Sequence, residues 1–473
     1  MYTAQGGIMA RKSENTTPVG LKGMNELFGN IKQYQATRLP TYQKLWGYYR
    51  NPHDSQTQRE GLPARLKRKD AFGAAKEIVI ENDIAWRVHA MIDFMFSREP
   101  TIQSLATSSE RADDIERFLK DTIKANGGMN FYHNLALIGA IYGFVDLLVR
   151  IDDSKQIVIE TLAAPRIVPK LSASDYRKLD SYVIAWDEEN SGIQKTLLGK
   201  LKSKVLQKNT AKSVSHIYHL TPEYFDYALV PNGDISHHSK VTRTPNPFGY
   251  MPLVHIQNMS QPFHYEGLGE VEPLISLQDE LNTRLSDRAN RVTFHAFKMY
   301  LGKGIDGFVD RQVGPGQMWA TENLDAEIEE FGGDAHTPSE DSHIAEIRDA
   351  LDKASGISPL VTGSVRDRIG NLTSENALRI VMMGLLAKTA KKRINYGDGL
   401  IKMCNMILHA ATITGEFVTK PEERLVRLDW PEPMPIGESQ SLVNAEKKLR
   451  IGVPQKQVLA ELGYSKIDQI EES

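Results

Sequence analysis

One stretch of the sequence, from Gly267 to Phe297, restricts the fold most, because its apolar residues repeat with the period of a long helix. Along "GLGEVEPLISLQDELNTRLSDRANRVTFHAF" the apolar positions recur at intervals of three or four: Val271, Leu274, Leu277, Leu281, Leu285, Ala289, Val292 and Ala296. A helix of roughly 26 residues is about 39 Å long. The opposite side is polar and carries Glu272, Glu280, Thr283, Asp287, Asn290 and Arg291. A rod with so narrow an apolar stripe has to find partners for it.

The residues that follow predict that this helix is one arm of a helical hairpin. Glycines crowd "KMYLGKGIDGFVDRQVGPGQMWA", residues 298–320, which favours short strands and tight turns. After the acidic "ENLDAEIEEFGGD", helical spacing returns at Ile344, Ile347, Leu351 and Ala354. We expect such a hairpin, with its thin apolar faces, to pack against copies of the chain or against other proteins.

A second long helix is predicted beyond the hairpin. The segment "SGISPLVTGSVRDRIGNLTSEN" breaks the helical pattern with its glycines and with Pro359. Helical spacing then runs from about Ser374 to Ala411, and the glycines at 384, 397 and 399 predict a kink. The tail predicts a strand in "RLDWPEPMP" and a final helix in "ESQSLVNAEKKLRIGVPQKQVLAELG".

The first half of the chain predicts helices followed by a β-rich region. Residues 25–50, 84–95 and 115–125 have helical spacing, and "LALIGAIYGFVDLLV" predicts a buried helix that runs into a strand. From Gly143 to about Asn258 the period shifts towards two, in runs such as "SYVIAWDE" and "PLVHIQN". This order favours an α+β fold over a doubly wound sheet.

Aromatic residues are predicted to serve packing. In the first helix we expect inward packing of Trp46, Tyr48 and Tyr49. The residues predicted as core or interface anchors, rather than as stacking platforms for a ligand, are Trp86, Trp319 and Trp430.

Composition narrows the class of protein. With 473 residues, the chain is long enough for two or more domains. The net charge of −3 argues against a generally basic nucleic-acid binder. Cys404 is the only cysteine, which excludes a disulfide framework and a metal site of paired thiolates and suits a reducing compartment.

Targeting and membrane segments are not predicted. Residues 1–24 are expected to form a flexible polar arm without a signal peptide, and Met1 and Met9 both remain open as the start. The most apolar segment, Leu135 to Val149, is shorter than the ~20 residues that span a bilayer, and Asp146 interrupts it. We therefore expect no membrane span.

The motifs of common catalytic sites are missing from the sequence. Gly199-Lys200 and Gly302-Lys303 lack the rest of a P-loop, and no H-E-x-x-H, G-x-S-x-G or dinucleotide fingerprint is present. Four histidines fall in two pairs that are not expected to come together as metal ligands. One pair, His216 and His219, is predicted on opposite faces of a strand, and the other, His237 and His238, in a polar turn. The acidic residues that could act as general acids, Asp146, Asp152 and Asp310, are interpreted as accidental. The sequence therefore predicts no catalytic residue, no cofactor and no metal site.

Charge is distributed unevenly along the chain. Both predicted hairpin helices are mildly acidic, whereas the segment from Arg366 to Arg393 contains seven bases and two acids. Such a segment is either a solvated helix face or a surface that faces a polyanion.

Several motifs, taken in order, resemble those of the portal proteins of tailed bacteriophages. Asn246-Pro247-Phe248-Gly249 with Pro252 resembles the family's "NPFG-x-x-P" turn and strand, and "LQDELN", Leu277 to Asn282, resembles the core of its first stem helix. "SGISPLVTGSVRDRIGNLTSENALRI" is similar to the segment that leads through the tunnel loop into the long kinked helix. "IYGFVDLLVRID" and "LDWPEPMP" fit further family positions, so the resemblance covers the chain from about Trp46 onward.

The resemblance implies a domain organisation. The implied fold is α+β, with an α/β wing, a helical-hairpin stem, a small β-rich clip, a long kinked helix and a short helical crown. The implied boundaries are 1–24 for the arm, 25–266 for the wing, 267–297 for stem helix 1, 298–337 for the clip, 338–356 for stem helix 2, 357–373 for the tunnel loop, 374–411 for the long kinked wing helix, and 412–473 for the return strand and crown. The polar side of the stem is then expected to face the channel or the outside.

The resemblance also implies a function. Portals are ring-shaped, typically dodecameric, and lie at one capsid vertex of the virion, where double-stranded DNA passes during packaging and ejection. The implied partners are further copies of the chain, the DNA, the major capsid protein, the terminase large subunit and a head-tail adaptor. Before it reaches the virion, the protein is expected in the host cytoplasm during assembly. In the tunnel loop, Arg366, Arg368 and Asn371 are the candidate DNA contacts, unless the arginines instead pair with Asp367 or a neighbouring subunit.

Two other classes of function stay open on sequence grounds. One is a different capsid or head-tail connector component, although adaptors are usually much shorter than this chain. The other is a metal-dependent hydrolase or nuclease, which requires convergent acids or histidines that the sequence does not display.

Overall fold

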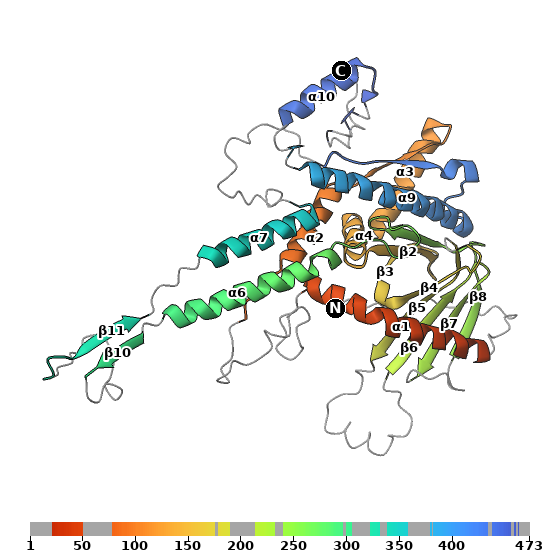
Figure 1. The fold of residues 1–473 in the computed structure, drawn as a ribbon. Helices are drawn as coiled ribbons and strands as arrows, with labels where there is room; N and C mark the ends of the chain where they lie inside the picture. Colours follow the sequence, from red (N-terminus) through yellow and green to blue (C-terminus); the bar gives the residue numbers. More distant parts are fainter. Residues whose placement is uncertain are drawn as a thin grey trace, which may run out of the picture.

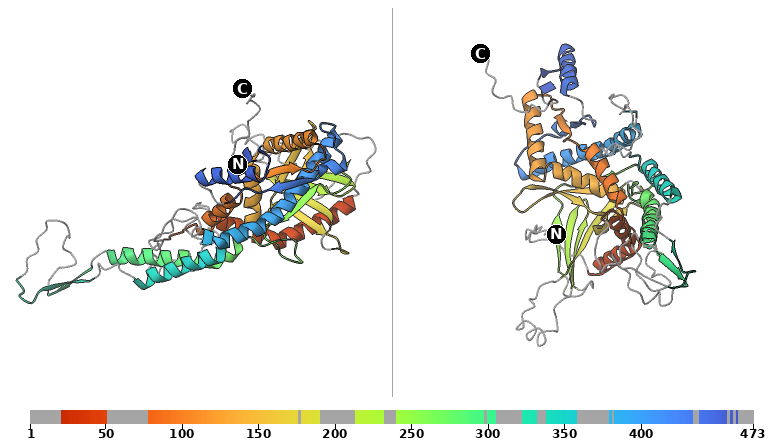
Figure 2. Two further views of the ribbon diagram at one scale, coloured as in Figure 1. Left: turned by 90° about the horizontal axis from the view of Figure 1, so that it is seen from above. Right: turned by 90° about the vertical axis from the view of Figure 1, so that its left-hand side faces the viewer.

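The computed structural model of the chain is elongated, with a mixed α and β body from which a pair of helices projects (Figures 1 and 2). It describes residues 21–50, 78–175, 178–189, 213–231, 240–296, 299–304, 322–331, 338–357, 379–380, 382–433, 438–455, 458–459 and 462. Within these residues every paired strand is antiparallel, which confirms the α+β prediction. No helix in the described ranges is both long enough and apolar enough to cross a membrane.

The predicted transition from a buried helix to a strand is confirmed. Helix α4, Met129–Tyr142, ends at Gly143, which adopts φ 84° and donates its N–H to the Gly139 carbonyl. A left-handed residue after a helix favours glycine because it has no Cβ. Strand β2, Phe144–Ile151, follows at once and is buried over most of its length.

The two largest sheets among the described residues are both antiparallel and lie in the body. β2 is central in the sheet β3-β2-β9, with β3 at Ile157–Leu162 and β9 at Leu253–Gln257. The larger sheet has the order β4-β5-β6-β7-β8, with bounds Ile167–Leu171, Leu179–Glu189, Ser213–Leu220, Tyr224–Pro231 and Lys240–Pro245. Our pattern search missed β4 and β8, because each contains a proline and has little apolar alternation.

Helix α1, Leu21–Arg50, lies across one face of the larger sheet (Figure 1). Its Ile31 is buried in a cluster with Val183, Ile217 and Val230 of that sheet. Tyr48 is buried as predicted, but Trp46 is 37% exposed and stacks on Tyr142 at the margin of the core. The prediction of an inward Trp46 is therefore wrong in the single chain.

Helix α9, Met383–Thr414, covers the smaller sheet and is helical without interruption. A Cβ on Gly399 would lie 2.4 Å from Ile256 of β9, and one on Gly397 would lie 3.4 Å from Trp430. These glycines let the helix approach its neighbours closely, a role that explains them without a kink. The predicted start at Ser374 lies outside the described residues.

The remaining elements surround this core. Helices α2, Asp83–Met95, and α3, Ser109–Ala125, agree with the sequence pattern. β12, Val426–Asp429, confirms the predicted strand in "RLDWPEPMP" and pairs with β1, Thr101–Ser104, which was not predicted. Three short 3-10 turns, Ala164–Arg166, Glu272–Leu274 and Pro421–Arg424, and helix α10, Glu438–Arg450, complete the described elements.

The projecting pair consists of α6, Ile275–Ala296, and α7, Pro338–Ser355, with a two-stranded ribbon beyond it (Figure 1). The ribbon pairs β10, Met299–Lys303, with β11, Glu327–Phe331. Both helices were predicted, but α6 begins later than Gly267. A 3-10 turn that contains Pro273 precedes it, and proline has no N–H to continue an α-helical ladder.

Candidate functional site: the root of the helical hairpin

The two hairpin helices bury their apolar stripes against each other and against the body within one chain. Leu281 and Leu285 of α6 belong to the same buried cluster as Ile344, Ile347 and Leu351 of α7. Most of the stripe therefore needs no neighbouring subunit, contrary to our expectation from sequence. Val292, near the end of α6 that is farthest from the body, is 42% exposed. For this residue of the stripe, contact with another subunit is still expected.

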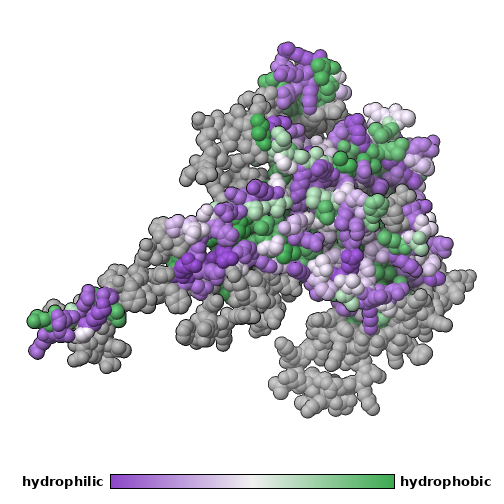
Figure 3. Space-filling model, viewed as in Figure 1, coloured by the Kyte–Doolittle hydropathy of each residue, from purple (hydrophilic) through white to green (hydrophobic). Residues whose placement is uncertain are grey.

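Ion pairs on the hairpin surface also join the two helices. Arg288 lies 2.8 Å from Asp341, Arg291 pairs with Glu340, and the side chain of His343 lies 3.7 Å from Glu280. Hydrophilic side chains dominate the visible outer face of α6 (Figure 3). Exposed pairs of this kind contribute little each, about 0–1 kcal/mol, so the buried leucines and isoleucines hold the hairpin together.

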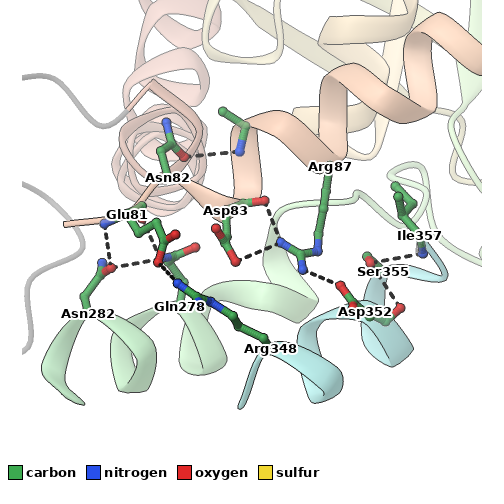
Figure 4. A network of polar contacts seen from close by, with 11 residues as sticks. Glu81, Asn82, Asp83, Arg87, Gln278, Asn282, Arg348, Asp352, Ser355 and Ile357 are labelled. Carbon is green, nitrogen blue, oxygen red and sulfur yellow. Dashed lines mark hydrogen bonds and ion pairs between the residues drawn. The ribbon is translucent and has the colours of Figure 1, made fainter. Parts of the chain in front are cut away.

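The side of α6 that faces the body is polar and buried. Gln278, Asn282 and Ser286 follow one another at intervals of one helical turn, and all three are at most 3% exposed. They bond to the main chain of residues 79–81, and Figure 4 shows the contacts of Gln278 and Asn282 with Glu81. Asn282 Oδ1 accepts the Glu81 N–H at 3.1 Å, Gln278 Nε2 donates to the Glu81 carbonyl at 2.7 Å, and Ser286 Oγ accepts the Val79 N–H at 3.0 Å.

This face corrects the predicted polar side of the helix. Thr283, expected to face a channel or solvent, is 2% exposed, and its hydroxyl donates to the Asp279 carbonyl one turn back. By contrast, the predicted polar positions Glu280, Asp287 and Asn290 are partly exposed.

Arg87 of α2 ties the other hairpin helix to the body. Its guanidinium is 3% exposed and contacts Asp83 at 3.1 Å and Asp352 of α7 at 2.5 Å (Figure 4). One turn earlier on α7, Arg348 lies 2.6 Å from Glu81. Both hairpin helices are thus bonded to the segment that begins α2.

A buried triad fixes the root to α9. The carboxylate of Glu270, which is 6% exposed, lies 2.7 Å from the ammonium nitrogen of Lys392 and also pairs with the ammonium of Lys388. Lys388 additionally donates to the carbonyl of Ser355, the last residue of α7, at 2.7 Å. One carboxylate therefore joins the entrance of α6, the exit of α7 and the long helix.

Electrostatics explains why this buried group stays charged. Burial alone would raise the pKa of the Glu270 carboxyl, but Lys392 and Lys388 outweigh it and lower that pKa to about 2. Burial lowers the pKa of Lys392, and Glu270 opposes that shift. Breaking such a pair on one side leaves an uncompensated buried charge.

Three glycines allow the chain to cross itself at the root. A Cβ on Gly143 would lie 2.2 Å from the Gly267 carbonyl oxygen, and one on Gly269 would lie 3.1 Å from the Ala140 carbonyl. This close approach lets the Glu270 N–H donate to the Ala140 carbonyl at 2.7 Å. The loop before α6 is therefore bonded directly to the end of α4.

The candidate DNA contacts predicted from sequence, Arg366, Arg368 and Asn371, lie outside the described residues. The basic segment that contains them is partly explained by the body. Lys388 and Lys392 pair with buried Glu270, and Arg393 lies over the Trp430 ring and donates to the Pro431 carbonyl. For these three residues, the interpretation as a surface that faces a polyanion is wrong.

The root itself was not found from sequence. Its signals were present in the i, i+4 spacing of Lys388 and Lys392 and of Gln278, Asn282 and Ser286. Nothing in one sequence, however, shows that such polar rows are buried, because a charged or amide row at helical spacing is most often solvent-exposed.

The candidate catalytic residues do not converge in the described part of the chain. His216 contacts the Tyr227 hydroxyl and His219 contacts Asp226, so the two imidazoles have separate partners. His237, His238 and Asp310 lie outside the described residues. No group of three or more His, Cys, Asp or Glu side chains that could hold a metal ion occurs among the residues described.

An elongated α+β protein whose best-built feature is a rigidly rooted, projecting hairpin belongs to the class of structural assembly components. The chain belongs to the phage portal protein family: residues 29–470 match the family described as "Phage portal protein, SPP1 Gp6-like". The protein is thus a phage portal, or head-to-tail connector, as the sequence motifs indicated. The family is structural rather than enzymatic, and membership implies a ring oligomer that joins capsid and tail components in the virion.

Two solved structures resemble the chain at 11% identity. One, described as "Virion of native gene transfer agent (GTA) particle", has a TM-score of 0.43 and covers 80% of this chain and 89% of its own. The other, "Neck of empty GTA particle computed with C6 symmetry", has a TM-score of 0.44 and covers 81% and 90% respectively. No curated protein matches the sequence.

Proposed function

We propose that copies of this chain close into a ring, most simply a dodecamer, at one vertex of the capsid and form the channel for DNA packaging and ejection. The observation that carries the proposal is family membership over residues 29–470. The rooted hairpin supports it, because a helical pair held at a fixed angle to its body can repeat around an axis as the wall of a channel.

The domain boundaries follow from the same proposal. Residues 25–266 form the wing, the α6 and α7 region the stem, and residues 298–337 the clip. The ribbon β10–β11 supports the last assignment: two strands alone are marginally stable in water, so the ribbon gains most from contacts with other subunits. Residues 374–411 form the long wing helix, and residues 412–473 the return strand and crown.

The proposed partners are double-stranded DNA inside the ring, the major capsid protein around it, the terminase large subunit during packaging and a head-tail adaptor afterwards. Assembly takes place in the host cytoplasm and ends at the portal vertex of the virion. Hydrolysis of ATP belongs to the terminase, in keeping with the missing P-loop motif.

The tunnel loop, residues 357–373, is the proposed DNA contact, through Arg366, Arg368 and Asn371. Both flanks of this loop are held at the root, since Lys388 of α9 donates to the carbonyl of Ser355 at the end of α7. Arginines repeated around a ring would touch phosphates from all sides, while the acidic stem limits the total attraction.

Ring formation is tested by native mass spectrometry and electron microscopy of the purified protein. A closed ring is expected, and a species no larger than a dimer at micromolar concentration would refute the proposal. The same preparation should neither hydrolyse ATP nor cut DNA. A metal-dependent nuclease activity abolished by one Asp or Glu substitution would show that the chain is an enzyme as well.

The tunnel loop is tested with the double substitution Arg366→Ala and Arg368→Ala. The control, Arg117→Ala with Arg450→Ala, removes the same charge from two exposed sites, each of which pairs with an acid of its own helix. We expect both rings to assemble but only the loop variant to reduce the yield of DNA-filled heads. Normal filled heads would show that these arginines do not grip DNA, and failure to assemble would show a structural role.

A further inference from the structure

A buried cluster of polar side chains lies between the two sheets of the body, away from the root triad. Asp146 of β2 is 1% exposed and stands directly opposite His255 of β9. Its Oδ2 accepts the hydroxyl protons of Tyr182 at 2.5 Å and Tyr265 at 2.8 Å, and its Oδ1 lies 2.6 Å from His255 Nδ1. The portal function described above assigns no role to this cluster.

The partners of His255 determine its protonation state. Nδ1 faces the Asp146 carboxylate, and Nε2 lies 2.9 Å from the carbonyl oxygen of Tyr265. A carbonyl oxygen can only accept a hydrogen bond. The Asp146 carboxylate already accepts hydrogen bonds from two phenol hydroxyls and, when ionised, has no proton to donate. With Asp146 ionised, both ring nitrogens donate, which only the imidazolium can do.

The surroundings favour a positive charge at this position. The imidazole is stacked on the Tyr265 ring with 4.0 Å between centroids, and the Phe144 ring lies 5.7 Å away at a tilt, so two aromatic rings contact it. Burial and the negative charge of Asp146 raise the pKa of Tyr182 and of Tyr265 well above the usual value, which keeps both phenols protonated as donors.

Charged groups on the other packed elements are compatible with this state. Glu266, next in the loop, pairs with Arg38 of α1 at 3.3 Å and accepts from Tyr42 at 3.5 Å. Tyr34 of α1 is also close enough to influence both Tyr182 and Tyr265. The Arg38 charge is thus opposed by Glu266, and Asp146 is the acid that contacts the imidazole directly.

His255 contacts a loop that leads into the hairpin, through the Tyr265 carbonyl. Residues 259–266 fold back on β9, where Gln257 Nε2 donates to the His264 carbonyl at 2.8 Å and Gln257 Oε1 accepts the Gln261 N–H at 3.0 Å. Directly after this loop comes the glycine crossing that supports Glu270. We propose that His255 is a doubly protonated imidazolium that donates to Asp146 and to the Tyr265 carbonyl and thereby latches residues 259–266 against β9, at the root of the hairpin.

Nitrogen-15 NMR of the assembled protein, labelled in its histidine rings, tests the protonation state directly. The resonances that disappear in His255→Gln identify this ring among the 13 histidines. At neutral pH, two protonated ring nitrogens are expected for His255. A single protonated nitrogen overturns the proposal, and this readout from the unsubstituted protein does not depend on the folding of any variant.

Hydrogen exchange tests the latch. In His255→Gln, the rate of amide hydrogen exchange in peptides that cover residues 259–266, corrected for its intrinsic pH dependence, should rise about tenfold. This is the effect expected when one hydrogen bond to a charged group is lost. The control is His133→Gln, because His133 Nε2 lies 3.3 Å from the Phe96 carbonyl, a contact that a neutral imidazole satisfies. Unchanged protection of the loop in His255→Gln, or an equal rise in both variants, would refute the latch. Ring formation is a separate readout, so failure of this proposal is distinguishable from failure of the proposed portal ring.

Discussion

Replacing Glu270 by Gln removes the single negative charge that neutralises two ammonium groups at the root of the hairpin. Gln keeps the size of the side chain and can still accept a hydrogen bond, so the change isolates the charge. Lys392, 2% exposed, then has no counter-charge within the triad. A pKa lowered from 4.5 to about 2 corresponds to roughly 3 kcal/mol of stabilisation. Breaking one side of a buried pair typically costs about 3–5 kcal/mol.

We expect Glu270→Gln to reduce the free energy of unfolding by about 3–5 kcal/mol, which lowers Tm by about 6–20 °C for a cooperative unit of roughly 150–250 residues. Lys392→Met should cost less, because Glu270 keeps Lys388 and a methionine carries no buried charge. The assay is thermal and denaturant unfolding at matched protein concentration, since assembly shifts apparent stability. Glu446→Gln is the control, because Glu446 and its partner Arg450 are both largely exposed.

The pH dependence gives an independent check. Since the folded-state pKa of Glu270 lies below its ordinary value, the stabilisation is present above about pH 4.5 and is lost as pH falls towards 2. The difference between the native protein and Glu270→Gln should shrink over this window. If Glu270→Gln costs less than 1 kcal/mol, about the worth of a surface pair, or if Lys392→Met costs more than Glu270→Gln, the triad does not hold the root electrostatically.

Three further changes test the packing of the root. Gly139→Ala places a Cβ 2.0 Å from the buried Tyr396 hydroxyl, so we expect the free energy of unfolding to fall by about 1–3 kcal/mol. Adding Tyr396→Phe removes the hydroxyl and should restore part of this stability. If the effects of the two substitutions simply add, the clash is contradicted. Asn282→Ala removes the acceptor of the Glu81 N–H and should speed hydrogen exchange at that amide, a result that unchanged protection would exclude. Arg87→Met takes the buried guanidinium away from Asp83 and Asp352 and should cost about 3–5 kcal/mol by denaturant unfolding, against less than 1 kcal/mol for the exposed control Arg117→Met.

The sequence predicted those elements whose pattern is local. The apolar run around Ala140, the strand in "RLDWPEPMP" and both hairpin helices each have the period of their own structure, so tertiary context was not needed to find them. The start of α6 was placed too early, because Pro273 interrupts the helical bonds without interrupting the apolar spacing.

The sequence could not reveal contacts between distant segments. From its residue type and spacing, Lys392 reads as a basic residue on the exposed face of a helix. Only the fold brings it to Glu270, more than a hundred positions earlier in the chain. Thr283 was placed on an exposed side because its residue type is polar, yet it is 2% exposed in the fold. The same limit applies to β1, a strand of four residues whose pairing with β12 is visible only in the fold.

The contacts between α6 and the body fix an angle as well as a position. Residues 79 and 81 are two apart, which is about 6.6 Å along an extended chain, and four residues of helix advance about 6.0 Å. A row of side chains one helical turn apart can therefore bond to every second residue of the segment, as Asn282 and Ser286 do. Apolar faces tolerate sliding, whereas directional hydrogen bonds to buried main-chain groups are expensive to leave unmade. Because these bonds reach the main chain of residues 79–81, the tilt of α6 depends on its own side chains, whereas α7 is held through the side chains of Glu81 and Arg87.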